Sequence, residues 1–121
     1  MHFPKSSNDN PRWVLSDLPN VNLEALEFRH FRQGIQRANV YLDPATSAST
    51  AFLRYQPGAT VPLHRHIGYE HIWVLSGSQA DDDGVYPTGS VLIHGPGSQH
   101  RVWSDEGCLV LAIWERGVEF I

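Results

Sequence analysis

The stretch His64-Arg65-His66-Ile67-Gly68-Tyr69-Glu70 is the most informative part of this chain, because it brings two imidazoles and a carboxylate close together in sequence. Side chains at positions i and i+2 of a β-strand point to the same face, so His64 and His66 can reach one ion together. Glu70 follows a short turn and can return from the neighbouring strand. A third histidine, His100, lies in a Gly/Pro-rich region about thirty residues farther on.

Imidazole nitrogen and carboxylate oxygen are ligands that divalent zinc, iron, manganese and nickel accept, at roughly 2.0–2.2 Å for zinc. The alternative is a set of surface histidines on hairpin turns. Gly58 and Gly77 flank the stretch where a hairpin-rich barrel needs turns, and they favour the metal site. We therefore predict one divalent metal ion per chain, zinc or iron(II) first and manganese or nickel next. Its predicted ligands are His64, His66, Glu70 and His100.

Length and composition restrict the class of protein. With 121 residues the chain is long enough for one domain and one core. A net charge of −4 without a basic stripe argues against a nucleic-acid partner. No apolar run is long enough for a membrane helix, and the polar first residues do not resemble a secretory signal. A single cysteine, Cys108, excludes an intramolecular disulfide, so a cytoplasmic, reduced setting is expected.

Short apolar or β-branched runs separated by turn signals begin at Trp13 and predict an all-β barrel or sandwich. Residues 1–12 have a turn-forming composition and are expected to form a flexible N-terminal arm, which leaves 13–121 as the β-domain. The segment 18–28 fits neither the helical nor the strand period. The expected strands are 34–42, 50–55, 60–66, 70–75, 78–82, 90–94, 100–104 and 108–115.

Strand alternation predicts which residues surround the metal. If Glu70 faces inward, Ile72 and Val74 share its face, and Trp73 lies on the other. The ion is then expected in a partly dry cavity. The outer face is too aromatic to be fully hydrated, which indicates a covering segment or a second subunit, and a homodimer is expected.

These residues resemble the cupin family, whose members are small β-barrels with two signature segments. The first family pattern, G-x5-H-x-H-x3-E-x6-G, is met in full by Gly58, His64, His66, Glu70 and Gly77. The second, G-x5-P-x-G-x2-H-x3-N, is met in part by Gly89, Gly97 and His100, with Gly95 in place of the proline and Ser104 in place of the asparagine. The resemblance implies a small single-domain cupin β-barrel, the double-stranded β-helix of jelly-roll type.

The sequence is more similar to one branch of the cupins than to the others. The stretch Arg54-Tyr55-x-Pro57-Gly58-Ala59, the segment 70–77 and the hairpin at 82–86 look like the cupin domains of ChrR-like zinc anti-sigma factors. Small relatives in that branch include iron-dependent diketone-cleaving dioxygenases. Anti-sigma relatives also carry an N-terminal helical zinc domain. This chain has no Cys/His set before residue 60 that could build one, so a direct anti-sigma role is not expected.

Several other chemically reactive residues are assigned ordinary roles. His71 should point away from Glu70 and is predicted at the surface or at an interface. His94 is predicted as a plain strand residue, with a contact behind the ligands as the alternative. Cys108 opens an apolar strand and is predicted as a small buried hydrophobe. The run Asp81-Asp82-Asp83 is predicted as a solvated turn, because it lacks the ligand spacing of a calcium loop.

Two functional hypotheses from different classes remain. In the first, four protein ligands leave a position open on the metal, which binds a small molecule and, with iron(II), supports dioxygenase chemistry on a dicarbonyl or similar chelating substrate. In the second, the same site holds zinc in a non-catalytic sensor or regulatory module, like the cupin domain of ChrR-like anti-sigma factors. The sequence shows no independent general acid or base.

Overall fold

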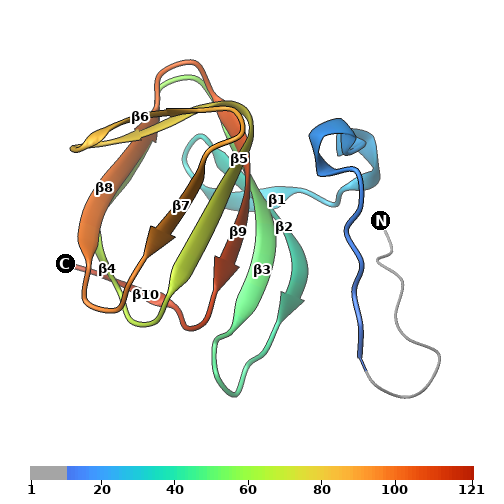
Figure 1. Ribbon diagram of the computed structural model, residues 1–121, viewed down its shortest axis with the longest axis horizontal. Coiled ribbons are helices and arrows are strands. Elements are labelled where there is room, and N and C mark those ends of the chain that lie inside the picture. The colour runs from blue at the N-terminus through green and yellow to red at the C-terminus, as the bar shows by residue number, and fades with distance from the viewer. Residues whose placement is uncertain (1–10) are drawn as a thin grey trace.

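The strands of this computed structural model form one sheet that curls back on itself (Figure 1). The structure describes residues 11–121, and the strands found there confirm the predicted all-β fold. The predicted arm over residues 1–12 lies almost wholly outside the described residues, so its division from the β-domain stays a prediction. The strands are β1 (Arg29–Arg32), β2 (Ile35–Leu42), β3 (Ser49–Tyr55), β4 (Ala59–His66), β5 (Glu70–Asp81), β6 (Gly84–Pro87), β7 (Val91–His94), β8 (Gln99–Ser104), β9 (Cys108–Trp114) and β10 (Val118–Phe120).

Hydrogen bonding places the strands in the order β1-β2-β3-β9-β5-β8-β4-β10, and β6 and β7 also pair with β5. Figure 1 shows β4, β8 and β10 on one side of the barrel and β2, β3 and β9 on the other. The segment 18–28 forms two 3-10 turns, η1 (Leu18–Asn20) and η2 (Leu23–Ala25), which agrees with its lack of a clear period. The short strands β1 and β10 were not expected from the sequence, whereas β6 forms the second strand of the hairpin expected at 82–86.

The prediction of separate strands at 70–75 and 78–82 is wrong, because β5 runs through both without a turn. The register of β5 against β9 shifts between Val74 and Ser76, which marks a bulge in a continuous strand. Gly77 follows the bulge with φ 71°, and a Cβ built there would lie 2.0 Å from the Gly107 carbonyl oxygen. The glycine therefore permits a close backbone contact and a left-handed conformation, and does not end the strand.

The barrel interior contains one of two apolar clusters. Ile72 and Val74, predicted to share the face of Glu70, are buried there at 4% and 0% exposure. Strand alternation therefore holds along the first half of β5. The other buried members of this interior cluster are Ile35, Leu53, Tyr55, Ala59, Val102, Cys108, Val110 and Ala112.

The second cluster lies on the outer face of the sheet, beneath the N-terminal segment. Leu18 of η1 and Leu26 pack with Leu75 of β5 and Leu111 of β9. Figure 1 shows this segment beside β2 and β3, outside the barrel. The expectation of a covering segment is thus confirmed for part of the outer face, while Trp73 remains 37% exposed.

Candidate metal centre

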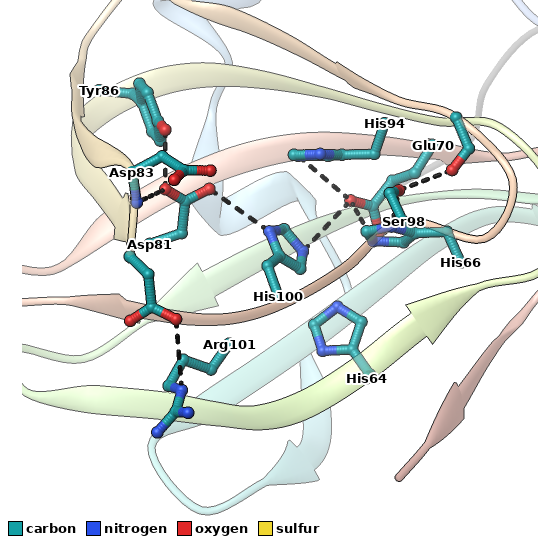
Figure 2. Close-up of polar contacts among 12 residues, drawn as sticks. His64, His66, Glu70, Asp81, Asp83, Tyr86, His94, Ser98, His100 and Arg101 are labelled. Carbon is teal, nitrogen blue, oxygen red and sulfur yellow. Dashed lines mark hydrogen bonds and ion pairs between the residues drawn. The ribbon is translucent and has the colours of Figure 1, made fainter.

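Five side chains from four strands converge inside the barrel (Figure 2). Strand β4 carries His64 and His66, β5 begins with Glu70, β7 ends with His94, and β8 carries His100. The register places His64 opposite His100 and Glu70 opposite His94. Residues paired across neighbouring strands project to the same face, so the strand pairing itself gathers these groups.

The four residues predicted as metal ligands all belong to this cluster. The donor atoms of His64, His66 and His100 lie within 4.8 Å of one another, and so do those of Glu70, His94 and His100. His64, His66 and Glu70 are buried at 4%, 1% and 5% exposure. These buried groups could hold a metal ion, and the assignment of four of them as ligands stays a prediction.

His94 is a residue within the cluster that the sequence analysis missed. It is not an ordinary strand residue, because its Nε2 lies 4.0 Å from Glu70 Oε1 and its ring stacks on that of His66 at 4.9 Å between centroids. The pairing with Glu70 across β5 and β7 directs it inward. The run Val91-Leu92-Ile93-His94 has no polar alternation, so the sequence alone carried no signal for its inward direction.

Hydrogen bonds fix which ring nitrogen of His64 and His66 carries the proton. His64 Nδ1 lies 2.9 Å from the Pro62 carbonyl oxygen, which can only accept. His66 Nδ1 lies 2.8 Å from Ser98 Oγ, and that hydroxyl already donates to the Gly95 carbonyl at 2.6 Å. Both Nδ1 atoms must therefore donate, and both Nε2 atoms present a lone pair to the centre of the cluster.

His100 is held by a carboxylate behind it. Its Nδ1 lies 3.4 Å from Asp81 Oδ2, while Asp81 Oδ1 accepts from Tyr86 Oη at 2.7 Å and from the Asp83 backbone N–H at 2.9 Å. Asp81 is buried at 7% exposure, so the prediction of a wholly solvated turn is wrong for this residue. A carboxylate placed behind an imidazole in this way fixes the orientation of the ring and its tautomer.

Glu70 is oriented by an indole. Its Oε2 accepts from Trp114 Nε1 at 2.7 Å, which leaves Oε1 directed at the imidazoles, 3.2 Å from His66 Nε2. Burial alone would raise the pKa of Glu70, but its interactions with a protonated His66 and with the Trp114 N–H outweigh this, so the pKa lies below its usual value. The carboxylate is therefore the form present at neutral pH.

The donor atoms fit a metal ion better than they fit each other. Among residues 11–121, the buried Nε2 atoms of His66, His94 and His100 have no hydrogen-bond partner. When His66 is neutral, with its proton on Nδ1, it turns a lone pair toward the Glu70 oxygen at 3.2 Å, and two acceptors at this distance repel. Ligands at about 2.1 Å from one ion lie about 3 Å apart at adjacent corners, so a cation would relieve this contact.

Burial keeps the imidazoles in the form that coordinates. It lowers the pKa of His64, His94 and His100 below the ordinary histidine value. The pKa of His100 lies at about 4, because the neighbouring imidazoles His94 and His64 add to the effect of burial. A metal ligand must be neutral imidazole, which is the form that His64, His94 and His100 take at neutral pH.

A cavity of about 250 Å³ adjoins the cluster, and His64, Glu70 and His100 form part of its wall. Much of the remaining wall is apolar. The polar donors thus face a space bounded mainly by apolar side chains, in which electrostatic interactions are stronger than in water. The apolar wall includes Leu53, Val61, Ile72, Val102, Val118 and Phe120.

Residues away from the cluster take the ordinary roles predicted for them. Cys108 is buried, and burial raises the pKa of its thiol to about 11, so it is a core residue without an activated thiolate. His71 is exposed on the outer face. Within the part of the chain that the structure describes, no helix is long and apolar enough to cross a membrane.

The sequence profile of the family described as the ChrR Cupin-like domain matches residues 19–115. Among curated proteins, none matches the chain significantly.

Solved structures with the same fold include the anti-sigma factor ChrR from Rhodobacter sphaeroides, in complex with SigE, at 25% identity and a TM-score of 0.70 over 85% of this chain and 56% of that one. An acetylacetone dioxygenase from Acinetobacter johnsonii is similar at 17% identity and a TM-score of 0.75, over 100% of this chain and 85% of that one. A protein of unknown function with a cupin-like fold from Ralstonia eutropha JMP134 gives 22% identity and a TM-score of 0.65, over 70% and 61%. The chain thus spans less than two thirds of two of these three structures.

Proposed function

The chain belongs to the family of ChrR cupin-like domains, and from this premise we propose that it is a mononuclear metalloprotein that binds a small molecule at an open metal position. The proposed ligands are His64, His66, Glu70 and His100. Zinc and iron(II) are the first candidates for the ion, and manganese and nickel follow. His94 is a fifth donor within reach of Glu70 and His100.

One observation supports small-molecule binding above all, namely that the donor cluster forms part of the wall of a cavity. Four protein ligands leave one or two positions open on a five- or six-coordinate ion. His64, Glu70 and His100 face the cavity, so an open position there is accessible to a molecule that enters it. A purely structural metal site is closed and needs no such space.

The enzymatic form of the proposal is a metal-dependent dioxygenase acting on a dicarbonyl or similar chelating substrate. When bound, the metal would act as a Lewis acid toward carbonyl oxygens and, as iron(II), support oxygen chemistry. The chain's own residues hold the metal ligands in position and shape the space in which the substrate binds. The Trp114 N–H holds Glu70 in place, Ser98 fixes the tautomer of His66, and the apolar wall excludes water. A fold shared with an acetylacetone dioxygenase makes diketones the first substrates to test.

The second candidate function is a zinc-binding sensor or regulatory module. The description of the family and the 25% identity to ChrR favour it. In this form the same four ligands hold zinc, and occupancy of the site is reported to a protein partner. The donor cluster is equally suited to both functions, so the metal and its open position must be tested directly.

Metal analysis of protein purified without chelators, followed by oxygen-consumption assays on β-diketones with iron(II) added, separates the two functions. The dioxygenase requires turnover that disappears in His64→Ala and persists in the control His30→Ala, whose side chain is exposed on β1. Tightly bound zinc at one ion per chain, with no turnover after exchange to iron(II), supports the sensor. Protein that retains no divalent metal and binds none on addition refutes both.

We also propose that the chain forms a homodimer through the outer face between β5, β7 and β9. Trp73, Ile93 and Ile113 are 37%, 64% and 39% exposed there, and the N-terminal segment covers a different part of the sheet. Exposed apolar surface of this kind marks an interaction site. Light scattering should give twice the mass of the chain, and a monomer at micromolar concentration would contradict the proposal.

A further inference from the structure

Arg37 lies close to the metal centre, separated from it by one indole ring. Trp114 donates its N–H to Glu70 at 2.7 Å, and the Arg37 guanidinium carbon lies 4.8 Å from the centroid of the same Trp114 ring. Both Arg37 and Glu70 belong to the wall of the cavity of about 250 Å³. A molecule in this cavity therefore meets the metal donors on one wall and a fixed positive charge on another.

The hydrogen bonds of Arg37 leave much of its donor capacity unused. Its Nε donates to Asn39 Oδ1 at 2.6 Å, and its Nη2 donates to Ser49 Oγ at 3.3 Å. Both partners are neutral, and guanidinium has five N–H donors. No carboxylate among residues 11–121 lies within 4.0 Å of its nitrogens, whereas Arg65 and Arg101 each have an acidic partner.

The surroundings of Arg37 make a missing anion costly. The residue is half-buried, and burial lowers the pKa of its guanidinium below the usual value. The rings of Trp114 and Phe31 lie near the charge, the latter at 5.4 Å from ring centroid to guanidinium carbon. These contacts compensate part of the lost hydration, but an oxyanion that accepts the remaining N–H groups would compensate more.

We propose that the cavity binds a small dicarboxylate whose oxo-acid end chelates the metal and whose far carboxylate is bound by Arg37. The proposal rests on the proposed metal centre and names its substrate class. The planar guanidinium fork matches a carboxylate in a way that a lysine would not. A cavity of about 250 Å³ has the volume of about eight water molecules at ~30 Å³ each, which suits a short oxo dicarboxylate of similar atom count.

The test uses metal-loaded protein and titration calorimetry with three probes. These are 2-oxoglutarate, which has both ends, 2-oxobutyrate, which lacks the far carboxylate, and acetylacetone, which is uncharged. Wild-type protein should bind 2-oxoglutarate best. Arg37→Gln should weaken that binding by about 10- to 100-fold and leave binding of 2-oxobutyrate unchanged. Arg37→Lys should lie in between, because it keeps the charge and loses the fork.

The control variant is Arg101→Gln, because Arg101 pairs with Asp82 at the surface and does not form part of the cavity wall. It should bind all three probes as wild type does. If Arg37 only supports the structure through its ring contacts, both Arg37 variants will lower the melting temperature while the ratio of 2-oxoglutarate to 2-oxobutyrate affinity stays the same. That result, or a preference of wild type for acetylacetone, overturns the proposal.

Metal content measured on the same samples separates this proposal from the proposed function. Equal metal content with equal 2-oxoglutarate affinity in wild type and Arg37→Gln refutes the dicarboxylate and leaves the metal centre intact. If the protein takes up no metal, the metal centre is refuted. Binding at Arg37 is then tested with glutarate, a dicarboxylate that lacks the 2-oxo group. Glutarate should alter tryptophan fluorescence in wild type and not in Arg37→Gln, and no change in wild type overturns the contact.

Discussion

Acidification should destabilise the metal-free protein, because folding buries histidines in their neutral form. His100 has a pKa of about 4 in the folded protein against 6.5 for an unperturbed histidine, and its side chain is only 10% exposed. Between these two values the unfolded chain binds a proton that the folded chain does not. Stability therefore rises with pH in this window and is lost as the pH falls from 6.5 toward about 4.

The magnitude follows from the two pKa values of His100. One pKa unit corresponds to about 1.4 kcal/mol, and integration from about pH 7.5 to about pH 5 gives a loss of about 2 kcal/mol for this residue alone. Burial lowers the pKa of His64 and His94 as well, so they add to the loss in the same direction. Against a typical stability of about 5–15 kcal/mol, such a loss is easily measured.

Urea unfolding of metal-free protein, followed by circular dichroism at the two pH values, measures the effect. The variant His100→Gln should lose about 2 kcal/mol less than wild type on acidification, because it lacks the group that titrates. The control His30→Gln removes an exposed histidine on β1 and should behave as wild type. Equal losses in wild type and His100→Gln would refute the reasoning, since the cluster would then not resist protonation.

Three further predictions concern the surroundings of the cluster. Ser98→Ala removes the hydroxyl that fixes the tautomer of His66 and should weaken metal affinity by about 10- to 100-fold in a chelator competition. The control Ser76→Ala, at an exposed position, should leave the affinity unchanged, and equal affinities in the two variants would contradict the tautomer argument. His94→Gln should retain one metal ion per chain by metal analysis while His100→Gln loses it, and loss of the ion from His94→Gln would make His94 a primary ligand. Gly77→Ala places a Cβ against the Gly107 carbonyl at positive φ and should lower the free energy of unfolding by about 2–4 kcal/mol. In the control Gly84→Ala the nearest neighbour atom lies at 3.6 Å, so the loss in urea unfolding should be clearly smaller, and similar losses in the two variants would refute the steric account.

The sequence predicted the fold because alternation and turn residues act locally. The expected strands at 34–42 and 108–115 agree with β2 and β9 to within one residue at each end. Gly77 was misjudged for a physical reason: a glycine that ends a strand and one that permits a close contact with Gly107 look alike in sequence. Only the register against β9 reveals a bulge.

The cluster was partly predictable for the same reason. His64, His66 and Glu70 are near in sequence, and His100 was placed by its motif. The positions of His94 and Asp81 follow from contacts between distant segments, which the sequence does not reveal. His94 joins the cluster because β7 pairs with β5, and Asp81 joins it through its contact with His100. Long-range pairing thus determines the residues behind and beside the ligands, which pattern analysis cannot supply.

The two candidate functions share their donors and differ in what the cavity must do. A zinc sensor needs only the imidazoles and carboxylate, with Ser98, Asp81 and Trp114 holding them in position. A guanidinium in the cavity wall without an acidic partner among the described residues adds nothing to metal retention, and its desolvation costs free energy. Natural chains keep such a cost where it serves binding. Dicarboxylate affinity that depends on Arg37 would therefore favour small-molecule chemistry at the metal, and its absence would favour the sensor.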